Sequence, residues 1–521
     1  MIGVVGCALL SVRFSQHPHL SLAALPAVLG DLAIFVLATG VSPKKFRIFG
    51  ICWLAAAVVM SVVGVLRGGT GPDFVSVIGN RNFVGAYLAA SVCITASLWH
   101  QPGPIREGGC KEVSYGAWNA GFFIAMCLLM AALCLCRSRG AWLALAIVAM
   151  MTLVLLAPGA PILKWGGALA LIVIVTVLGH VYINQQWQTD VRPMIWKGTL
   201  EMISARPLLG HGLDVFRIDY TRFRPPEYFL RPKAVNLTDH AHNEMLETAA
   251  EQGLLGLGAR LWLWIAVFRL AMQSWRTDKD PAQRGIRLGL MGAALVFVLH
   301  GMVDVDLRHP PNQTLLWLVL GLMISDGQSQ PVLLTVRSLL ARSILAICSL
   351  VVAVAIAWAS VIEPVRADWW ERRSRVSNSR GDYQTAVTAA EKALEIDPLR
   401  LETRYFLAGL FASAPGEEQH RRAIQECLRI EELAPDYADI TYNLGQLFLS
   451  QRQPGAALPF LQRAVQLNPY NADKRIRLGV ALDQLGDVLP AREQWEAALQ
   501  LHPGDPAIKT LLAHDQPSTQ P

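Results

Sequence analysis

Long apolar runs separated by short polar segments fill the first two-thirds of this 521-residue chain. A helix needs about 20 largely apolar residues to cross the hydrocarbon core of a bilayer. We therefore predict ten membrane-spanning helices, of which the ninth is the shortest. They cover residues 21–40, 49–66, 77–98, 118–136, 140–157, 162–182, 252–272, 287–304, 311–325 and 338–361. The pattern predicts an all-α, polytopic membrane domain over residues 1–362.

Two places in this domain depart from the apolar pattern. The third predicted span begins with the polar residues Asn80, Arg81 and Asn82, so we expect that end to face water or a cavity. The stretch Met1–Val12 is apolar but short, and it lacks the basic residues that begin a signal peptide. We interpret it as half of a spanning helix.

The last third of the chain follows a different pattern, in which a similar phrase is repeatedly closed by proline. The spacings between these prolines are 37, 34 and 34 residues. The prolines are Pro398, Pro435, Pro469 and Pro503. A 34-residue period is typical of tetratricopeptide repeats (TPRs), in which antiparallel helix pairs stack into a solenoid. We predict a TPR domain at residues 363–510, which either binds a peptide or protein partner or acts as a passive spacer, and a disordered tail at 511–521.

Composition supports this division into two bodies. The chain is 53% hydrophobic and only 17% charged, whereas soluble proteins carry about 25% charged residues. From Glu363 onward there are 18 Lys/Arg against 22 Asp/Glu, and the rest of the chain holds 28 against 18. The nine cysteines show no Cys-x-x-Cys or zinc spacing. The opposite charge balance indicates that the two parts have different surroundings.

The basic residues in the short loops predict how the membrane domain is oriented. Cytoplasmic loops collect Lys and Arg. Loops on one side, including 41–48 and 273–287, carry about twelve basic residues, and the short loops on the other side carry six. We therefore predict that the long segment 183–251 and the C-terminal tail lie on the outer, periplasmic side.

The outer segment 183–251 contains most of the polar chemistry of the first two-thirds. It begins with a predicted helix at about Arg192–Ala205, and a turn follows at Arg206–Gly212. From Arg217 to Lys233 there are five basic residues, two acids and several aromatic residues. Such a surface suits a diphosphate or an anionic glycan, although a loop that only adheres to lipid headgroups would look the same.

A histidine pair precedes the next helix. His240 and His242 are followed by Glu244, which is one pattern for a metal site, but no third ligand lies at a standard spacing. A single histidine acting as a general base is the favoured interpretation, because imidazole titrates near neutral pH. Asp239 and Asn243 also leave open a purely structural role as helix caps.

Arg139 opens the fifth predicted span in the phrase Ser138-Arg139-Gly140. A charge at the edge of a span is unfavourable unless it reaches the interface or is paired. A guanidinium group binds phosphate oxygens in a bidentate manner. Arg139 is therefore a candidate phosphate ligand, with simple extension to the interface as the alternative.

Four groups of short phrases stand in one order along the chain. The groups are Gly79–Leu88, Ser138–Trp142, Arg192–Trp196 with Pro207–Leu213, and His240–Asn243 with Glu251–Gly256. Their order resembles the O-antigen ligase and O-antigen polymerase (Wzy-C) family of membrane glycosyltransferases, over about residues 75–325. Arg81 departs from the family pattern, where we would expect a small or apolar residue or proline.

The resemblance implies an all-helical membrane enzyme with a GT-C-like fold. Such enzymes take a glycan from an undecaprenyl-diphosphate carrier on the periplasmic face of the bacterial inner membrane. They transfer it to lipid A core, to another carrier-linked unit or to a protein. The reaction is thought to need no metal, and we expect no cofactor and no nucleic-acid partner.

The resemblance also implies roles for individual residues. Arg139 and Arg192 would bind the carrier diphosphate, and His242 would deprotonate the acceptor hydroxyl. We add Arg217 and Arg222 from the basic stretch as candidate donor-binding residues. The candidate supporting residues are His240, Asn243, Arg81 and Tyr220.

A ligase is our leading prediction, and a polymerase of the same donor chemistry is the first alternative. A second alternative is a non-catalytic membrane anchor whose repeats recruit envelope-assembly partners. A third is a transporter, which would need ionisable residues in the middle of spans, and Asp31 is the main candidate for that role.

Overall fold

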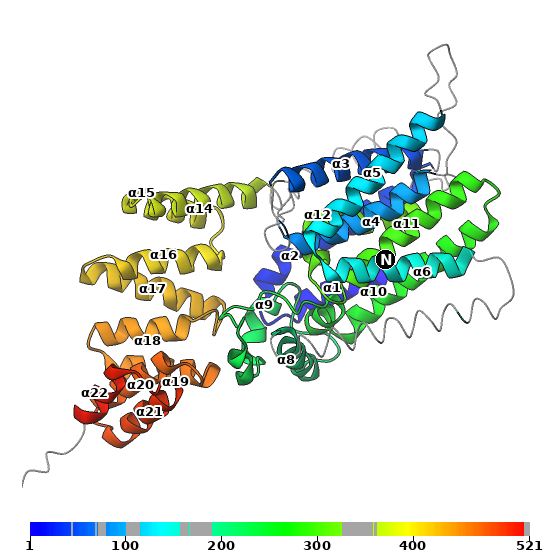
Figure 1. The fold of residues 1–521 in the computed structure, drawn as a ribbon. Coiled ribbons are helices and arrows are strands. Elements are labelled where there is room, and N and C mark those ends of the chain that lie inside the picture. Colours follow the sequence, from blue (N-terminus) through cyan, green and yellow to red (C-terminus); the bar gives the residue numbers. More distant parts are fainter. Residues whose placement is uncertain are drawn as a thin grey trace, which may run out of the picture.

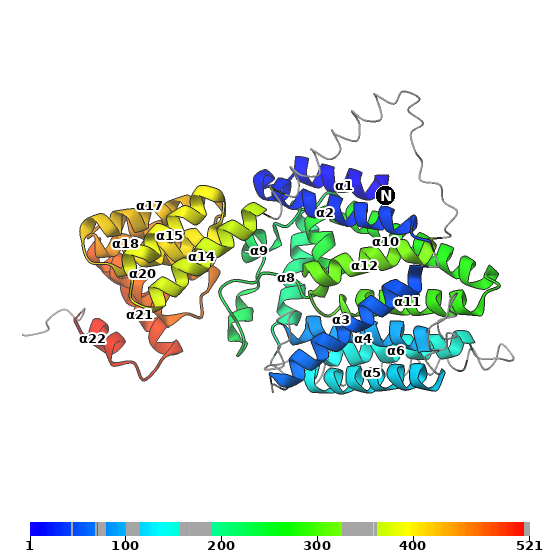
Figure 2. The same cartoon turned by 90° about the horizontal axis from the view of Figure 1, so that it is seen from above.

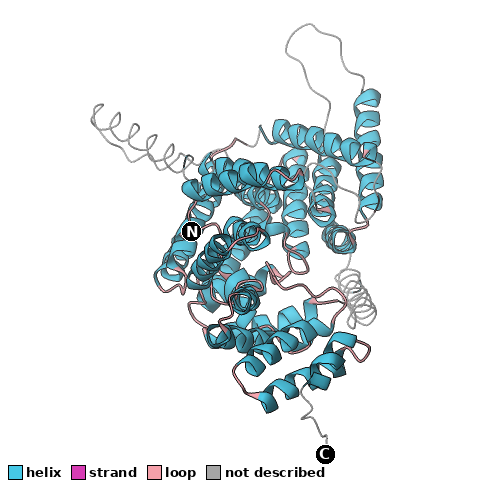
Figure 3. Cartoon of the chain, turned by 90° about the vertical axis from the view of Figure 1, so that its left-hand side faces the viewer, coloured by secondary structure: helices cyan, strands magenta, loops and turns pink. Residues whose placement is uncertain are grey.

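The computed structural model describes residues 1–42, 45–67, 80–99, 115–156, 190–325 and 362–514, with the isolated residues 70, 166 and 358. Within these ranges the chain forms helices and loops and contains no strand (Figure 3). A helical bundle and a helical solenoid lie on either side of an irregular segment (Figures 1 and 2). The prediction of an all-α membrane domain followed by a TPR solenoid is confirmed.

The bundle is built from long apolar helices. In the described residues, seven helices are long and apolar enough to cross a membrane, and α1 and α12 are shorter. The helices of the bundle are α1 (Ile2–Arg13), α2 (Pro18–Thr39), α3 (Phe46–Leu66), α4 (Arg81–Trp99), α5 (Tyr115–Cys136), α6 (Arg139–Leu156), α10 (Glu244–Thr277), α11 (Pro281–His300) and α12 (Pro310–Ile324). The predicted spans 162–182 and 338–361 lie outside the described residues, apart from the isolated residues 166 and 358.

Small residues let the central helices of the bundle approach closely. Helix α4 packs against α3, α5, α6 and α11. A Cβ added to Gly289 of α11 would lie 2.5 Å from the Cβ of Ser97, and one added to Gly85 of α4 would lie 2.6 Å from the Cβ of Ser138. Close contact at small residues is the usual way in which membrane helices associate, since lipid gives apolar side chains no preference for one another.

The irregular segment between bundle and solenoid, residues 190–243, is the described part of the outer segment that precedes α10. Its helices are α8 (Arg192–Ala205), α9 (Phe216–Asp219), η3 (Tyr220–Arg222) and η4 (Pro226–Leu230). The bounds of α8 confirm the predicted helix. Ile195, Met202 and Tyr228 help to form a small apolar core. Tyr220, a candidate supporting residue, is fully buried there and stacks on Phe216 with 4.9 Å between ring centroids.

Helix α10 is kinked at Gly253, where φ is 68°. A side chain at Gly253 would overlap the carbonyl group of Leu208, and the backbone N–H of Leu254 donates to the Pro207 carbonyl at 2.7 Å. The turn of the outer segment is therefore attached to the kink, and only glycine accepts this conformation without strain. The helix predicted after the histidine pair and the predicted span 252–272 are two halves of this one kinked helix.

The solenoid consists of four helical hairpins and a final helix. Its helices are α14 (Glu363–Ser379), α15 (Tyr383–Ile396), α16 (Leu401–Ser413), α17 (Glu417–Leu433), α18 (Ile440–Ser450), α19 (Pro454–Leu467), α20 (Ala472–Gln484), α21 (Val488–Leu501) and α22 (Pro506–His514). Gly445 packs against Leu461, and Gly479 packs against Trp495, at the crossings of the two last hairpins. The predicted disordered tail at 511–521 needs correction, because α22 continues through its first four residues and the rest lie outside the described ones.

The solenoid rests on the outer segment. Ile218 of α9 is fully buried in one apolar cluster with solenoid residues of α15 to α18, and Leu237 packs against the same cluster. The contact also includes the ion pairs Arg217–Glu402 and Arg222–Asp436. The TPR domain thus covers one side of the outer segment and buries apolar surface there.

Candidate functional site

Asp304, in the loop after α11, is the centre of a cluster of polar side chains. Its Oδ2 accepts hydrogen bonds from Nδ2 of Asn82 at 2.5 Å and from Nη2 of Arg192 at 3.2 Å. Its Oδ1 lies 3.7 Å from Nδ1 of His242. Burial opposes ionisation of Asp304, but the neighbouring His242 and Arg192 outweigh burial and hold its pKa well below its usual range.

The loop that carries His242 is fixed on both sides. The backbone N–H of Ala241 donates to Oε2 of Glu247 at 2.8 Å, and the carbonyl of Ala241 accepts from Nε1 of Trp196 at 2.9 Å. Asn243 caps α10 by accepting from two backbone N–H groups of the first turn. His242 itself has a φ of 52°, a left-handed conformation that a non-glycine residue rarely adopts. These contacts offset that strain and keep the imidazole beside Asp304.

His240 has a different partner. Its Nδ1 lies 2.8 Å from Oε1 of Glu247. Burial favours the neutral imidazole, but the charge of Glu247 and this hydrogen bond outweigh it and raise the pKa of His240. His242, by contrast, has a buried Nδ1 with no hydrogen-bond partner in the described part of the chain. The two histidines are thus chemically distinct, with His242 the one that is less tightly engaged.

Arg139 and Arg81 are the first residues of α6 and α4. Neither has an ion-pair partner among the described residues, and Arg139 is exposed while Arg81 is half-buried. The close packing of Gly85 on Ser138 places the starts of these two helices together. Oγ of Ser138 in turn lies 3.5 Å from Nε2 of His300, the last residue of α11. The starts of α4 and α6, which carry Arg81 and Arg139, therefore lie at the same edge of the bundle as His300.

Arg308 is the hub of a buried ionic network behind this edge. Its Nη1 donates to Glu251 at 2.7 Å and its Nε to Glu244 at 3.0 Å, and Glu247 lies 3.5 Å away. Arg260 forms a second ion pair with Glu244. Removing one partner of such a buried network leaves an uncompensated charge, so the network holds the turn after α11 firmly against the first half of α10.

Arg217 and Arg222, predicted as donor-binding residues, face the TPR domain. Arg217 forms an ion pair with Glu402 of α16. Arg222 Nε lies 3.8 Å from Oδ2 of Asp436, in the turn before α18. The structure therefore separates these two arginines from the group formed by Arg139, Arg192 and His242.

Within the described ranges, no group of three or more His, Cys, Asp or Glu side chains could hold a metal ion. The histidine pair does not form such a group, because His240 lies beside Glu247 and His242 lies beside Asp304.

Several residues of the site were not singled out by the sequence. They are His300, Asp304, Asp306 and Arg308. Nδ1 of His300 lies 2.7 Å from Oδ1 of Asp306. The available signal was a dense run of ionisable residues, from His300 to His309, at the end of an apolar span. The sequence prediction placed His300 and Asp304 inside the span 287–304 and gave them no role.

Comparison with known proteins gives two kinds of match. Residues 124–261 match the family described as O-antigen ligase. This range contains Arg139, Arg192 and His242. Residues 416–472 and 448–514 each match a family described as tetratricopeptide repeat. The predicted resemblance is confirmed, since one part of the chain matches the O-antigen ligase family and its C-terminal part matches TPRs.

Individual relatives cover only parts of the chain. An O-antigen ligase of Pseudomonas aeruginosa is 33% identical over 119 residues, which are 22% of this chain and 26% of that protein. BBSome complex member BBS4 of Xenopus tropicalis is 33% identical over 98 residues, 19% of each chain. The chain thus spans about a quarter of the length of the first relative and a fifth of the second.

Among solved structures, two that are similar to part of the chain are MamA and YrrB. The match to a crystal structure of MamA has 25% identity and a TM-score of 0.27, and it covers 29% of this chain and 80% of MamA. YrrB, described as a TPR protein with an unusual peptide-binding site, has 24% identity and a TM-score of 0.28, and covers 30% and 79%.

Proposed function

We propose that this protein is a membrane glycosyltransferase of the O-antigen ligase type. It transfers a glycan from an undecaprenyl-diphosphate carrier to an acceptor hydroxyl on the periplasmic face of the inner membrane. The observation that carries this proposal is the meeting of three helix starts around Asp304, with a fourth beside them. Asn82 comes from the first turn of α4, Arg192 from the start of α8 and His242 from the loop before α10. Ser138, which precedes α6, lies beside His300 at the end of α11.

This arrangement suits a diphosphate. The positive end of each helix dipole favours anions at a helix N-terminus. Arg192 adds a guanidinium group that is shared with Asp304, and Arg81 and Arg139 are the first residues of α4 and α6 at the same edge. Charged contacts are stronger at the edge of a low-dielectric membrane than in water. These arginines and helix N-termini would stabilise the negative charge that develops on the departing carrier diphosphate.

His242 is the proposed general base. With its Nδ1–H directed at Asp304, the Nε2 atom carries the free lone pair that accepts a proton. A movement of roughly 0.5 Å would bring Nδ1 and the carboxylate to hydrogen-bond distance, as catalytic contacts tighten on substrate binding. Nε2 then removes the proton of the acceptor hydroxyl. The acceptor oxygen bonds to the anomeric carbon while the bond from that carbon to the carrier diphosphate breaks.

The test is complementation of a strain deleted for this gene, with surface glycan scored by gel at matched membrane expression. We expect His242→Ala to abolish glycan transfer and Asp304→Asn to reduce it by about 100-fold, because the base then lacks its orienting charge. His240→Ala is the matched control and should keep most of the activity. If unlinked long chains accumulate, the enzyme is a ligase, and single units indicate a polymerase.

Wild-type glycan from the His242→Ala strain would refute the proposed role of His242. Loss of transfer in His240→Ala alone would instead move the base to His240.

A further inference from the structure

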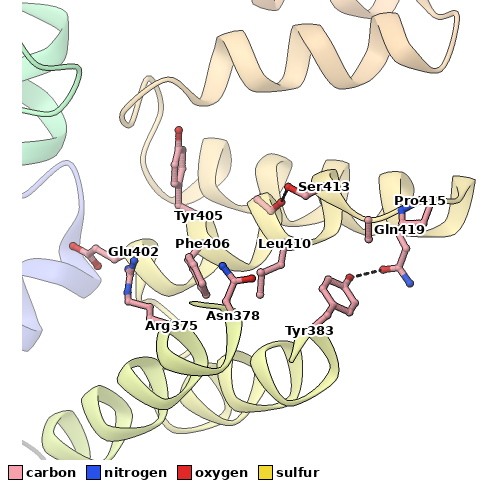
Figure 4. Close-up of a pocket in the computed structure, with 12 residues that line it drawn as sticks. Arg375, Asn378, Tyr383, Glu402, Tyr405, Phe406, Leu410, Ser413, Pro415 and Gln419 are labelled. Atoms are coloured by element: carbon pink, nitrogen blue, oxygen red, sulfur yellow. Dashed lines mark hydrogen bonds between the residues drawn. The ribbon is translucent and has the colours of Figure 1, made fainter. Parts of the chain in front are cut away.

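A groove of about 790 Å³ lies between the first two hairpins of the TPR domain. Figure 4 shows Arg375 of α14 and Glu402 of α16 at one end of the groove and Tyr383 and Gln419 at the other. Oη of Tyr383 donates to Oε1 of Gln419 at 3.3 Å, which closes that end. Ligand sites for small molecules commonly have volumes of about 300–1,000 Å³, so the groove has room for several sugar rings or a short peptide.

The groove has no net charge. Arg375 and Glu402 are the charged residues among those that line it. Arg375 is paired with Glu371 at 2.8 Å, and Glu402 with Arg217. An anionic ligand would therefore find no free cation there, and a cationic one would find no free carboxylate. This charge balance favours an uncharged ligand.

The uncharged lining combines flat rings with hydrogen-bonding groups. Tyr405 and Phe406 are half-buried, with the guanidinium of Arg375 over the Phe406 ring at 4.7 Å from its centroid. Asn378 and Ser413 are exposed on the facing helices. Aromatic rings offer apolar faces to the C–H faces of sugar rings, while amide and hydroxyl groups can bind sugar hydroxyls. A helical peptide would instead need deep apolar pockets, and here Leu410 is only 6% exposed in the floor.

One end of the groove lies beside the outer segment. Glu402, which lines it, is the residue that pairs with Arg217 of α9. A chain that leaves the membrane edge along the outer segment would therefore meet the groove next. We propose that the groove binds an uncharged stretch of the glycan that the membrane domain transfers, an inference that rests on the function proposed above.

Gly409 provides a direct test. It is exposed, it lines the groove, and a Cβ added there would have no atom within 4 Å, so Gly409→Trp introduces an indole into the groove from an open position. Gly455 of α19 is equally exposed and open but lies outside the groove, so Gly455→Trp is the matched control. The full chain in lipid nanodiscs is titrated with glycan released by mild acid from the host's own surface polysaccharide. We expect Gly409→Trp to weaken binding at least about 10-fold and Gly455→Trp to leave it within about 2-fold.

Equal binding by Gly409→Trp and wild type, or no binding by wild type, would overturn the proposal. A photo-crosslinking amino acid at Ser413 in living cells separates the two ligand classes. A glycan adduct that resists protease supports the proposal, and a protease-sensitive peptide adduct alone overturns it. The His242→Ala chain should bind the glycan like wild type in nanodiscs. If it does, and yet transfers glycan normally in cells, the function proposed above fails while the groove assignment stands.

Discussion

The edge of the membrane bundle and the contact between outer segment and TPR domain use arginine in different ways. Arg192 lies where α8 begins, beside Asp304 and His242, with 21% of its side chain exposed. Arg217 lies on α9 with 32% exposed and pairs with Glu402 of the solenoid. Both belong to one outer segment, and both were predicted to bind the donor. The difference teaches that the surroundings of a cation, above all helix N-termini and a candidate base, decide whether it suits a diphosphate.

Replacing each arginine separately should give the largest difference in glycan transfer, with the larger loss at Arg192. Arg192→Ala should lower glycan transfer by about 100-fold, because a preorganised contact to the developing charge is lost. Arg217→Ala should lower it by no more than about 3-fold, the effect of weakening one half-exposed ion pair. Transfer is measured by complementation at matched membrane expression, as for His242→Ala.

Arg192→Lys is the control for folding, since it keeps the charge beside Asp304. It should recover part of the activity, but not all of it, because lysine lacks the bidentate geometry of arginine. A larger loss in Arg217→Ala than in Arg192→Ala would reverse the comparison and assign the donor to the solenoid contact.

Local sequence patterns predicted the elements well. The 34-residue period follows from helix pairs that pack closely at glycine, as Gly445 and Gly479 do in the structure. The bounds of α8 follow from Pro193 at its start and the polar turn after Ala205. The length of an apolar run likewise predicts a membrane span, because a helix must be long enough to cross the hydrocarbon core of the bilayer. These signals are local, and each can be read from neighbouring residues.

The partners within the site could not be predicted in this way. Asp304 is 62 residues beyond His242 and 222 beyond Asn82, and only the packing of α4, α8 and α11 brings these residues together. The basic charge of the outer segment could be read from the sequence. The solenoid carboxylates that pair with Arg217 and Arg222 could not, because they are distant along the chain. Sequence alone therefore gave the candidates His242 and Arg192, and tertiary packing separated them from Arg217 and Arg222.

A charge exchange at the solenoid contact should have a smaller effect. Arg217→Glu and Glu402→Arg each place like charges together and should loosen the contact between outer segment and solenoid. The double variant restores an ion pair, and a double-mutant cycle should give a coupling energy of about 0.5 kcal/mol, as for other half-exposed pairs. Thermal unfolding and protease cleavage between bundle and solenoid provide the readout. Additive single effects, with no recovery in the double variant, would show that this ion pair does not hold the two parts together.

The smallest expected effect distinguishes the two histidines by pH. Burial favours the neutral form of His240, but Glu247 outweighs burial and raises the pKa of His240 above its ordinary 6.5. A group whose pKa is raised on folding stabilises the protein fully below its unfolded pKa, and this stabilisation is lost as pH rises through the folded pKa. The Tm difference between wild type and His240→Gln should therefore be largest at about pH 6 and shrink by about 1 °C towards pH 8.5. If His240→Gln keeps the pH dependence of wild type, His240 does not carry the proton, and the distinction between the two histidines must rest on Asp304 alone.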